Sequence, residues 1–176
     1  MRGAAFFFGA GRCSTCHRGA SLSDFRAHNT AVPQVGPGIG DGPAGNDDFG
    51  FEHVSGDPRT RYAFRTTPLR NVELTAPYGH DGAYVTLGAV LSHYRDPRRE
   101  LEAYDASVPE PVLRDTLVPN HDAMLATLDP LMQPVPMGAA EMTDLRAFMG
   151  ALTDASSRDL LSTIPDRVPS GLPVAD

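Results

Sequence analysis

The sequence CSTCH at residues 13–17 constrains the fold of this chain more than any other feature. Two thiols separated by two residues lie on one turn of backbone, and that turn also places the following imidazole. This CxxCH spacing is the signature of covalent haem attachment, in which each thiol bonds one vinyl group and the imidazole ligates the iron. A redox-active CxxC would instead follow a β-strand, whereas the apolar run at 4–8 reads as a short helix. We therefore expect Cys13, Cys16 and His17 to hold one haem c.

Length and composition indicate a small domain built around such a group. The 176 residues are enough for one domain with a real core. The 17 glycines and 16 prolines predict short helices joined by long, irregular loops. We expect an all-α, cytochrome c-like haem domain over residues 1–162, followed by an extended C-terminal tail over residues 163–176.

Two helical segments carry clear sequence signals. Apolar residues recur at spacings of three and four between Met142 and Leu152, which predicts an amphipathic helix facing the core. Thr86 is a suitable N-cap for a second helix, with Pro97 as its stop. The Gly/Pro/Asp-rich stretch at 19–60 predicts a long loop draped over a cofactor. The helices that we expect cover residues 3–18, 86–95, 110–118, 121–129 and 139–153, with the first paired to the last.

The charge balance narrows the range of partners. A net charge of −7 argues against nucleic acid or an anionic membrane surface as the main partner. No apolar run approaches transmembrane length. Because haem is attached to c-type cytochromes outside the cytoplasm, we expect a periplasmic or otherwise exported protein. The apolar stretch within Met1–Phe8 is too short for a signal peptide, so no leader is evident in this sequence.

Two downstream blocks carry a family resemblance. The sequences YAFRTTPLRNV at 62–72 and LTAPYGHDGA at 74–83 follow the GAGRCSTCHRG segment at 9–19. In order and spacing, these blocks resemble the C-terminal haem domain of the bacterial dihaem cytochrome c peroxidase/MauG family. The similarity runs from about residue 3 to residue 154, and the second block is far more specific than CxxCH alone.

The resemblance implies a function in peroxide chemistry. Members of this family pair an N-terminal peroxidatic haem domain with a C-terminal haem domain that delivers or stores electrons. This chain is similar to the second half of such an oxidoreductase, which uses hydrogen peroxide and takes electrons from a small redox protein. The sequence has one CxxCH motif and no tryptophan. We therefore expect no catalytic residue in this chain and negligible peroxidase turnover by it alone. The alternative is a stand-alone, single-haem electron carrier without bond chemistry.

The same resemblance suggests a second iron ligand. In ordinary peroxidases of the family, a methionine stands fourteen residues beyond the histidine that matches His80, and here that position is Tyr94. The chain thus looks like the MauG-type branch, in which a tyrosine oxygen ligates the iron. A phenolate is a hard donor that favours ferric iron, whereas a thioether favours ferrous iron. Competing ligands remain open from the residues alone, namely His93, Met124, Met132 and Met137.

Other residues have two interpretations each. Thr75 and Pro77 match family positions whose backbone carbonyls bind an interdomain calcium ion, although in isolation they form an ordinary turn. Arg70, like Arg65, is suited either to a haem propionate or to a surface ion pair. His80 and the following Asp81 lie either near the haem edge or in an exposed turn. We expect the remaining histidines to be ordinary polar residues: His28, His53 and His121.

Overall fold

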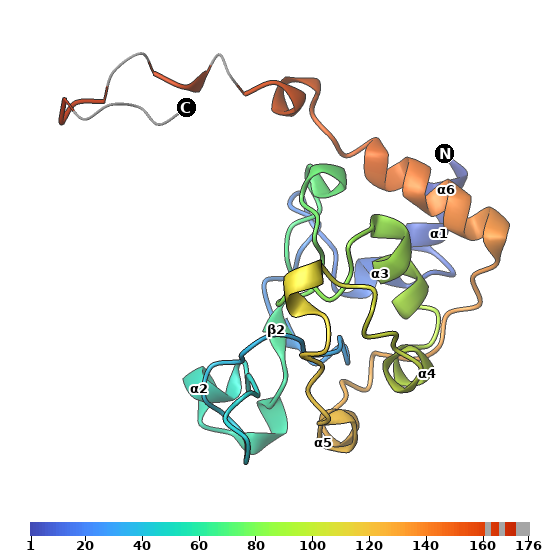
Figure 1. The fold of residues 1–176 in the computed structure, drawn as a ribbon. Coiled ribbons are helices and arrows are strands. Elements are labelled where there is room, and N and C mark those ends of the chain that lie inside the picture. Colours follow the sequence, from blue (N-terminus) through green and yellow to red (C-terminus); the bar gives the residue numbers. More distant parts are fainter. Residues whose placement is uncertain (161–162, 166–167, 172–176) are drawn as a thin grey trace.

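The computed structural model describes residues 1–160, 163–165 and 168–171. The chain forms short helices joined by long loops, with α6 and α1 lying together at one end of the molecule (Figure 1). The α-helices are α1 (Arg2–Phe8), α2 (Glu52–Ser55), α3 (Leu87–His93), α4 (Pro97–Glu102), α5 (His121–Ala126) and α6 (Ala139–Gly150). Single 3₁₀ turns are η1 (Cys13–Thr15), η2 (Pro58–Thr60), η3 (Val72–Leu74), η4 (Pro111–Leu113) and η5 (Ala155–Arg158).

The first and last α-helices pack against each other, as the sequence predicts. Gly3 of α1 is buried directly against the backbone carbonyl of Asp144 in α6, where a β-carbon would collide. One turn further on, the rings of Phe7 and Phe148 lie 5.1 Å apart between their centroids. Arg2 closes the pair at the surface with a two-pronged ion pair to the Asp144 carboxylate, at 2.7 and 2.9 Å. A glycine in the first helix therefore sets how closely the two helices approach.

Helix α1 is shorter than the expected helix at 3–18. It ends at Phe8, and the Gly9-Ala10-Gly11 sequence that follows breaks the helix because glycine disfavours helical backbone. The haem-attachment motif then forms the separate 3₁₀ turn η1, preceded by Arg12 in the left-handed conformation with φ 55°. The attachment turn is thus a distinct element rather than the end of the first helix.

Helix α3 begins where its cap predicts. The Thr86 hydroxyl oxygen accepts a hydrogen bond from the backbone N–H of Ala89 at 3.1 Å. Pro97 does not act as the stop of this helix but occupies the first turn of α4, which the sequence analysis missed. The first helical position needs no N–H donor, so proline is accommodated there, and Asp96 caps the new helix through Arg99.

A small sheet departs from the all-α expectation. Strands β1 (Ala27–His28) and β2 (Phe64–Arg65) pair antiparallel, with Ala27 opposite Arg65 and His28 opposite Phe64. With two residues in each strand, the pair has no hydrophobic alternation that a sequence would reveal. Among the described residues, the domain is therefore helix-rich with one short ladder, which joins the 19–60 loop to the YAFRTTPLRNV block.

The remaining differences concern the second half of the chain. The helix expected at 110–118 is reduced to the 3₁₀ turn η4, and α5 covers part of the segment expected at 121–129. Beyond α6, Asn71 holds the chain by accepting from the backbone N–H of Asp154 at 2.8 Å and donating to the Ser157 hydroxyl at 3.0 Å. The expected tail at 163–176 lies partly outside the described residues, so the boundary at 162 stays a prediction.

Buried apolar residues form three clusters rather than one continuous core. The first joins α1, α3 and α6 through Phe7, Leu91 and Leu145. The second centres on Tyr62 and Met124, and the third includes Val35, Tyr78, Ala83 and Tyr84. Among the described residues, no helix is long and apolar enough to cross a membrane. The divided core leaves space at the centre of the domain.

Candidate haem-binding site

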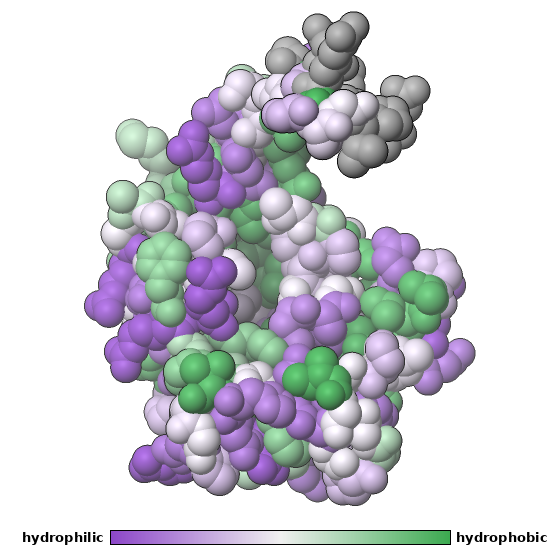
Figure 2. All heavy atoms as spheres, turned by 90° about the vertical axis from the view of Figure 1, so that its left-hand side faces the viewer, coloured by the Kyte–Doolittle hydropathy of each residue, from purple (hydrophilic) through white to green (hydrophobic). Residues whose placement is uncertain are grey.

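A cavity of about 290 Å³ occupies the space between the three clusters. Its walls come from segments far apart in the sequence: the attachment turn, the 28–32 loop, the YAFRTTPLRNV and LTAPYGHDGA blocks, α3 and the 131–137 loop. Most of the lining side chains are apolar, including Phe7, Leu69, Leu91, Leu145 and Met149. Figure 2 shows one face of the molecule, on which hydrophilic side chains surround a hollow with hydrophobic side chains in its base.

Both cysteines of the CxxCH motif line this cavity. Neither is in a disulfide, and burial raises the pKa of each thiol to about 11. Redox-active CxxC motifs need a thiolate, and their pKa is lowered rather than raised. The environment of Cys13 and Cys16 therefore does not suit disulfide exchange and suits two neutral thiols facing an apolar group.

His17 reaches the same cavity with its ring oriented by the backbone. Its Nδ1 atom lies 3.0 Å from the Leu22 carbonyl oxygen. Burial lowers the pKa of His17, outweighing the backbone contacts at Leu22 and Thr67 that favour the charged form. Because a carbonyl only accepts, Nδ1 of the neutral ring carries the proton and Nε2 keeps a lone pair. Such a second hydrogen bond is the usual way to orient a metal-ligating histidine.

Tyr94 also lines the cavity, whereas its neighbour His93 turns away from it. The His93 side chain is fully buried, with an exposed fraction of 0%. Its Nε2 donates to the Thr30 carbonyl oxygen at 2.7 Å, and its Nδ1 lies 2.8 Å from the Tyr84 hydroxyl. Both ring nitrogens are therefore occupied within the protein. Of the two neighbours weighed from the sequence, the structure brings Tyr94 to the attachment turn.

Methionine side chains also surround the cavity and offer thioether sulfur as a possible iron ligand. Met124, Met132, Met137 and Met149 all line the cavity, whereas Met142 packs against the α1–α6 core. Met149, expected as a core residue of the last helix, has both roles. The donor set of the cavity therefore includes tyrosine oxygen and thioether sulfur in addition to the His17 imidazole.

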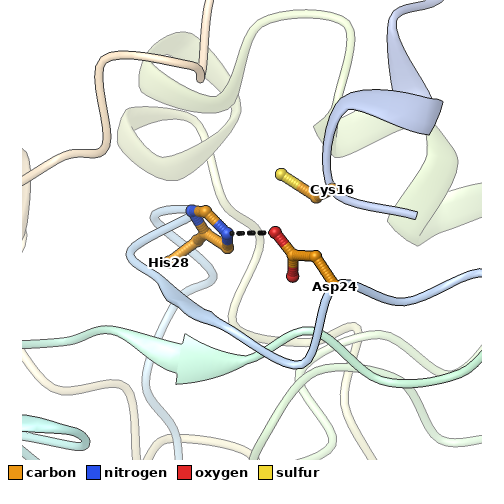
Figure 3. A group of neighbouring side chains, drawn as sticks. All are labelled: Cys16, Asp24 and His28. Carbon is orange, nitrogen blue, oxygen red and sulfur yellow. Dashed lines mark hydrogen bonds and ion pairs between the residues drawn. The ribbon is translucent and has the colours of Figure 1, made fainter. Parts of the chain in front are cut away.

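Figure 3 shows a further group near the attachment turn: Cys16, Asp24 and His28. Their sulfur, oxygen and nitrogen atoms lie within 4.8 Å of one another. The two ring nitrogens of His28 are already bonded to carboxylates, at 3.1 Å to Asp24 and 2.6 Å to Asp129. The Cys16 sulfur belongs to the attachment motif. The hydrogen bonds of this group therefore hold the segments beside the attachment turn together, and the group is not a separate metal centre.

The arginines expected near a propionate lie in different environments. Arg70 forms an ion pair with Asp154 at 3.2 Å, and its side chain is 74% exposed at the surface. Arg65 lines the cavity, as does Arg12, which donates to the backbone carbonyls of Gln133 and Pro134 at 2.9 Å each. The structure thus places Arg70 in the surface ion pair, and its binding of a propionate stays a prediction. Sequence reasoning missed Arg12, although its place beside the CxxCH motif was a usable signal.

The LTAPYGHDG block borders the cavity at one end. His80 lines it, stacked on Phe64 with 3.7 Å between ring centroids, and its side chain is 13% exposed. Asp81 accepts a hydrogen bond from the backbone N–H of Val35 at 2.6 Å. Thr75 and Pro77 lie in the exposed turn before Tyr78, away from the cavity lining, so the calcium role of their carbonyls stays a prediction.

A flat apolar group carrying an iron atom fits this arrangement. The cavity lies where a domain of this size would otherwise have its core, and members of all three apolar clusters border it. Two thiols, an oriented imidazole and a phenol converge on it from different elements. Thr30, which also lines the cavity, was missed because the 19–60 loop has no hydrophobic period to identify inward-facing residues.

Comparison with known proteins agrees with this geometry. No protein-family model matches the chain. Cytochrome-c peroxidase IdrP1 of Denitromonas iodatirespirans is 32% identical over 115 residues, which cover 53% of this chain and 30% of that protein. Methylamine utilization protein MauG of Methylorubrum extorquens is 36% identical over 93 residues, covering 53% of this chain and 24% of that protein.

Similarity in three dimensions extends further along the chain. The crystal structure of a MauG-like protein associated with microbial copper homeostasis matches with a TM-score of 0.65 and 29% identity. The match covers 88% of this chain and 46% of that protein. The chain therefore spans less than half of each relative named here. Sequence and fold lead to the same group of proteins: over the matched residues, the chain is similar to MauG and to the dihaem cytochrome c peroxidases.

Proposed function

We propose that this chain is the electron-transfer haem domain of a MauG-like oxidoreductase that uses hydrogen peroxide. In this proposal one haem c is bonded to Cys13 and Cys16 and ligated by His17 and Tyr94. The observation that carries the proposal is the convergence of all four side chains on one cavity. When bound, haem c would supply reversible one-electron chemistry at its iron.

The chain's own residues would prepare the site for that group. Leu22 fixes the His17 proton at Nδ1 and so leaves Nε2 as the donor atom. Tyr94 offers an oxygen whose phenolate form is a hard ligand, suited to holding iron in the ferric state. Burial raises the pKa of Tyr94, while a side-chain hydrogen bond from Thr30 favours the phenolate. The apolar wall around them excludes water and strengthens each electrostatic contact.

The partners follow from the family and are part of the proposal. A peroxidatic N-terminal haem domain would accept electrons from this one, and a small redox protein would donate them in the periplasm. Thr75 and Pro77 would contribute backbone carbonyls to a calcium site completed by the other domain. Carbonyl oxygen is a suitable ligand for calcium, but two such atoms need further ligands from elsewhere.

A turnover assay on the isolated holo-chain tests whether this chain transfers electrons while another domain performs the peroxidatic step. The protein is matured with haem in the periplasm, and its oxidation of a reduced electron donor is followed with and without hydrogen peroxide. We expect one haem per chain, reversible reduction and negligible peroxide-dependent turnover. Robust turnover by the isolated chain would contradict the assignment of the peroxidatic step to another domain.

A stand-alone electron carrier is the second candidate. It is favoured by the count of motifs, since this sequence has one CxxCH and no tryptophan. The two candidates differ when an N-terminal haem domain of the same enzyme is added to the assay. The electron-transfer half of a peroxidase should restore peroxide-dependent turnover with that domain, whereas a stand-alone carrier should not.

A further inference from the structure

We infer that His93 is the positioning residue that holds Tyr94 toward the haem cavity. This role rests on the proposed ligation by Tyr94 and adds a residue that does not itself touch the cofactor. The two residues are adjacent at the end of α3, where Tyr94 follows the last helical residue. The orientation of one side chain at this point therefore determines the orientation of the next.

Two directional hydrogen bonds fix the His93 ring. The Thr30 carbonyl only accepts, so the Nε2 atom of His93, 2.7 Å away, must carry a proton. An imidazole that carries its proton on Nε2 keeps a lone pair on Nδ1, and Nδ1 accepts from the Tyr84 hydroxyl at 2.8 Å. With one nitrogen donating and the other accepting, the ring has a single satisfied orientation.

Histidine is an unusual residue for this buried position. A position with an exposed fraction of 0% in a helix this short would ordinarily be apolar, because a buried polar group costs free energy unless it is bonded. A leucine would fill the same space without a preferred rotation. An imidazole with both nitrogens paired instead specifies one orientation for the end of α3. An iron ligand at the next residue needs such a fixed orientation.

The two hydrogen bonds of His93 connect it to two segments that border the cavity. Thr30, whose backbone carbonyl accepts from His93, lines the haem cavity together with Tyr94. Tyr84 pairs through its backbone with Tyr78, at 2.7 and 3.0 Å, in the LTAPYGHDG block. His93 thus ties the end of α3 to two separate walls of the cavity. Rotation of α3 that moved Tyr94 out of the cavity would break both bonds.

His93 also contacts Tyr94 directly. The His93 and Tyr94 rings meet edge to face, with 5.5 Å between centroids and 76° between planes. The imidazole thereby occupies the interior side of Tyr94 and leaves the cavity side as the direction available to the phenol. The Tyr84 ring also packs against the His93 ring, with 5.5 Å between their centroids.

Spectroscopy of the ferric holoprotein tests this role. Absorption and electron paramagnetic resonance spectra give the ratio of tyrosine-ligated haem to haem with other ligands, and the haem content per chain is measured alongside.

His93→Phe keeps a ring and removes the hydrogen bonds to Thr30 and Tyr84. This variant should lower the ratio of tyrosine-ligated to other haem about tenfold with haem content unchanged. His93→Gln keeps an amide donor for the Thr30 carbonyl and should recover part of the loss. Tyr84→Phe removes one hydroxyl and should lower the ratio about threefold even if His93→Phe fails to fold.

Tyr104→Phe is the matched control. Its hydroxyl is in the same neighbourhood, 5.7 Å between ring centroids from Tyr84, but donates to the Ala83 carbonyl at 2.5 Å instead of to His93. It should leave the spectrum unchanged.

Tyr94→Phe separates this inference from the proposal beneath it. If Tyr94→Phe leaves the spectrum of the wild type unchanged, the proposed ligation is wrong, and the positioning role is overturned with it. If Tyr94→Phe abolishes the tyrosine signature while Tyr84→Phe and His93→Gln match the wild type, only the positioning role of His93 is overturned. An equal effect of Tyr104→Phe and Tyr84→Phe would also overturn it, since general loosening would then explain both.

Discussion

The Nδ1 atom of His17 lies 3.0 Å from the carbonyl oxygen of Leu22. Leu22 itself adopts a left-handed backbone conformation with φ 50°, which turns the chain back toward the attachment motif. A non-glycine residue at positive φ is uncommon and marks a constrained turn. The loop after CxxCH therefore orients the imidazole through its backbone.

Replacing this imidazole gives the first prediction. His17→Ala should retain haem attached through the two cysteines but lose the histidine-ligated absorption spectrum. Free imidazole added to the variant should restore a histidine-type spectrum, because the cavity would then have room for the ring. His53→Ala, on a surface far along the loop, serves as the control. An unchanged spectrum in His17→Ala would show that another residue ligates the iron.

The contact between α1 and α6 gives a second prediction. A β-carbon at Gly3 would collide with the Asp144 backbone carbonyl, so Gly3→Ala should lower the free energy of unfolding by about 1–3 kcal/mol. Gly88→Ala is the matched control, because its β-carbon would meet its nearest neighbour at 3.9 Å in a helix where alanine is favoured. Denaturant unfolding of both variants measures the difference. Equal stability of the two would mean that the helices do not pack this closely.

The cap of α3 gives a third prediction, which concerns the helix that carries Tyr94. Thr86→Ala removes the oxygen that accepts from Ala89 and should cost about 1 kcal/mol of stability. Thr86→Ser retains that oxygen and should remain within a few tenths of a kcal/mol of the wild type. Thermal unfolding of the two holoproteins compares them directly, and similar losses in both would argue against a capping role.

The pair of His53 and Asp41 gives a pH-dependent prediction. The hydrogen bond and charge of Asp41 raise the pKa of His53, at 2.6 Å between Nε2 and Oδ2. Burial raises the pKa of Asp41, but hydrogen bonds from the Phe49 N–H and from His53 outweigh it and hold that pKa below its ordinary value. The His53 contribution is fully present below its ordinary pKa of 6.5 and is lost as pH rises through the raised value. The Asp41 contribution is present above 3.8 and is lost as pH falls through the lowered value.

The pair should therefore stabilise the fold most between these two ordinary pKa values. His53→Gln should be destabilised relative to the wild type in that window, and the difference should shrink toward alkaline pH. Unfolding free energies measured across the pH range test this, with the same substitution in an Asp41→Asn background as control. A pH-dependent difference that persists in that background would assign the effect to another partner of His53.

Sequence reasoning is strongest where chemistry imposes short-range spacing. CxxCH places three groups within five residues, and the structure brings all three to the cavity. Thr86 identified the start of α3, and the spacing from Met142 to Leu152 identified α6, because both signals are local. The pairing of the first and last helices also followed, although the glycine contact that sets its distance did not.

Contacts between residues far apart in the chain could not be predicted from the sequence. Thr30 and Arg12 reach the cavity through loop geometry that has no hydrophobic period, and the two-residue strands β1 and β2 are too short for alternation. Pro97 begins a helix rather than ending one, because proline fits both places and only the backbone around Asp96 distinguishes them. Arg70 illustrates the same limit, since Asp154 meets it from a segment 84 residues away.

Covalent haem attachment is the central claim, and the intact mass of the protein matured in the periplasm tests it most directly. The account predicts that the wild-type mass exceeds that of the polypeptide by one haem, that the Cys13→Ala/Cys16→Ala double variant loses the whole increment, and that Ser14→Ala retains it. A wild-type mass equal to that of the bare polypeptide, or lower by two hydrogens through a Cys13–Cys16 disulfide, would contradict it.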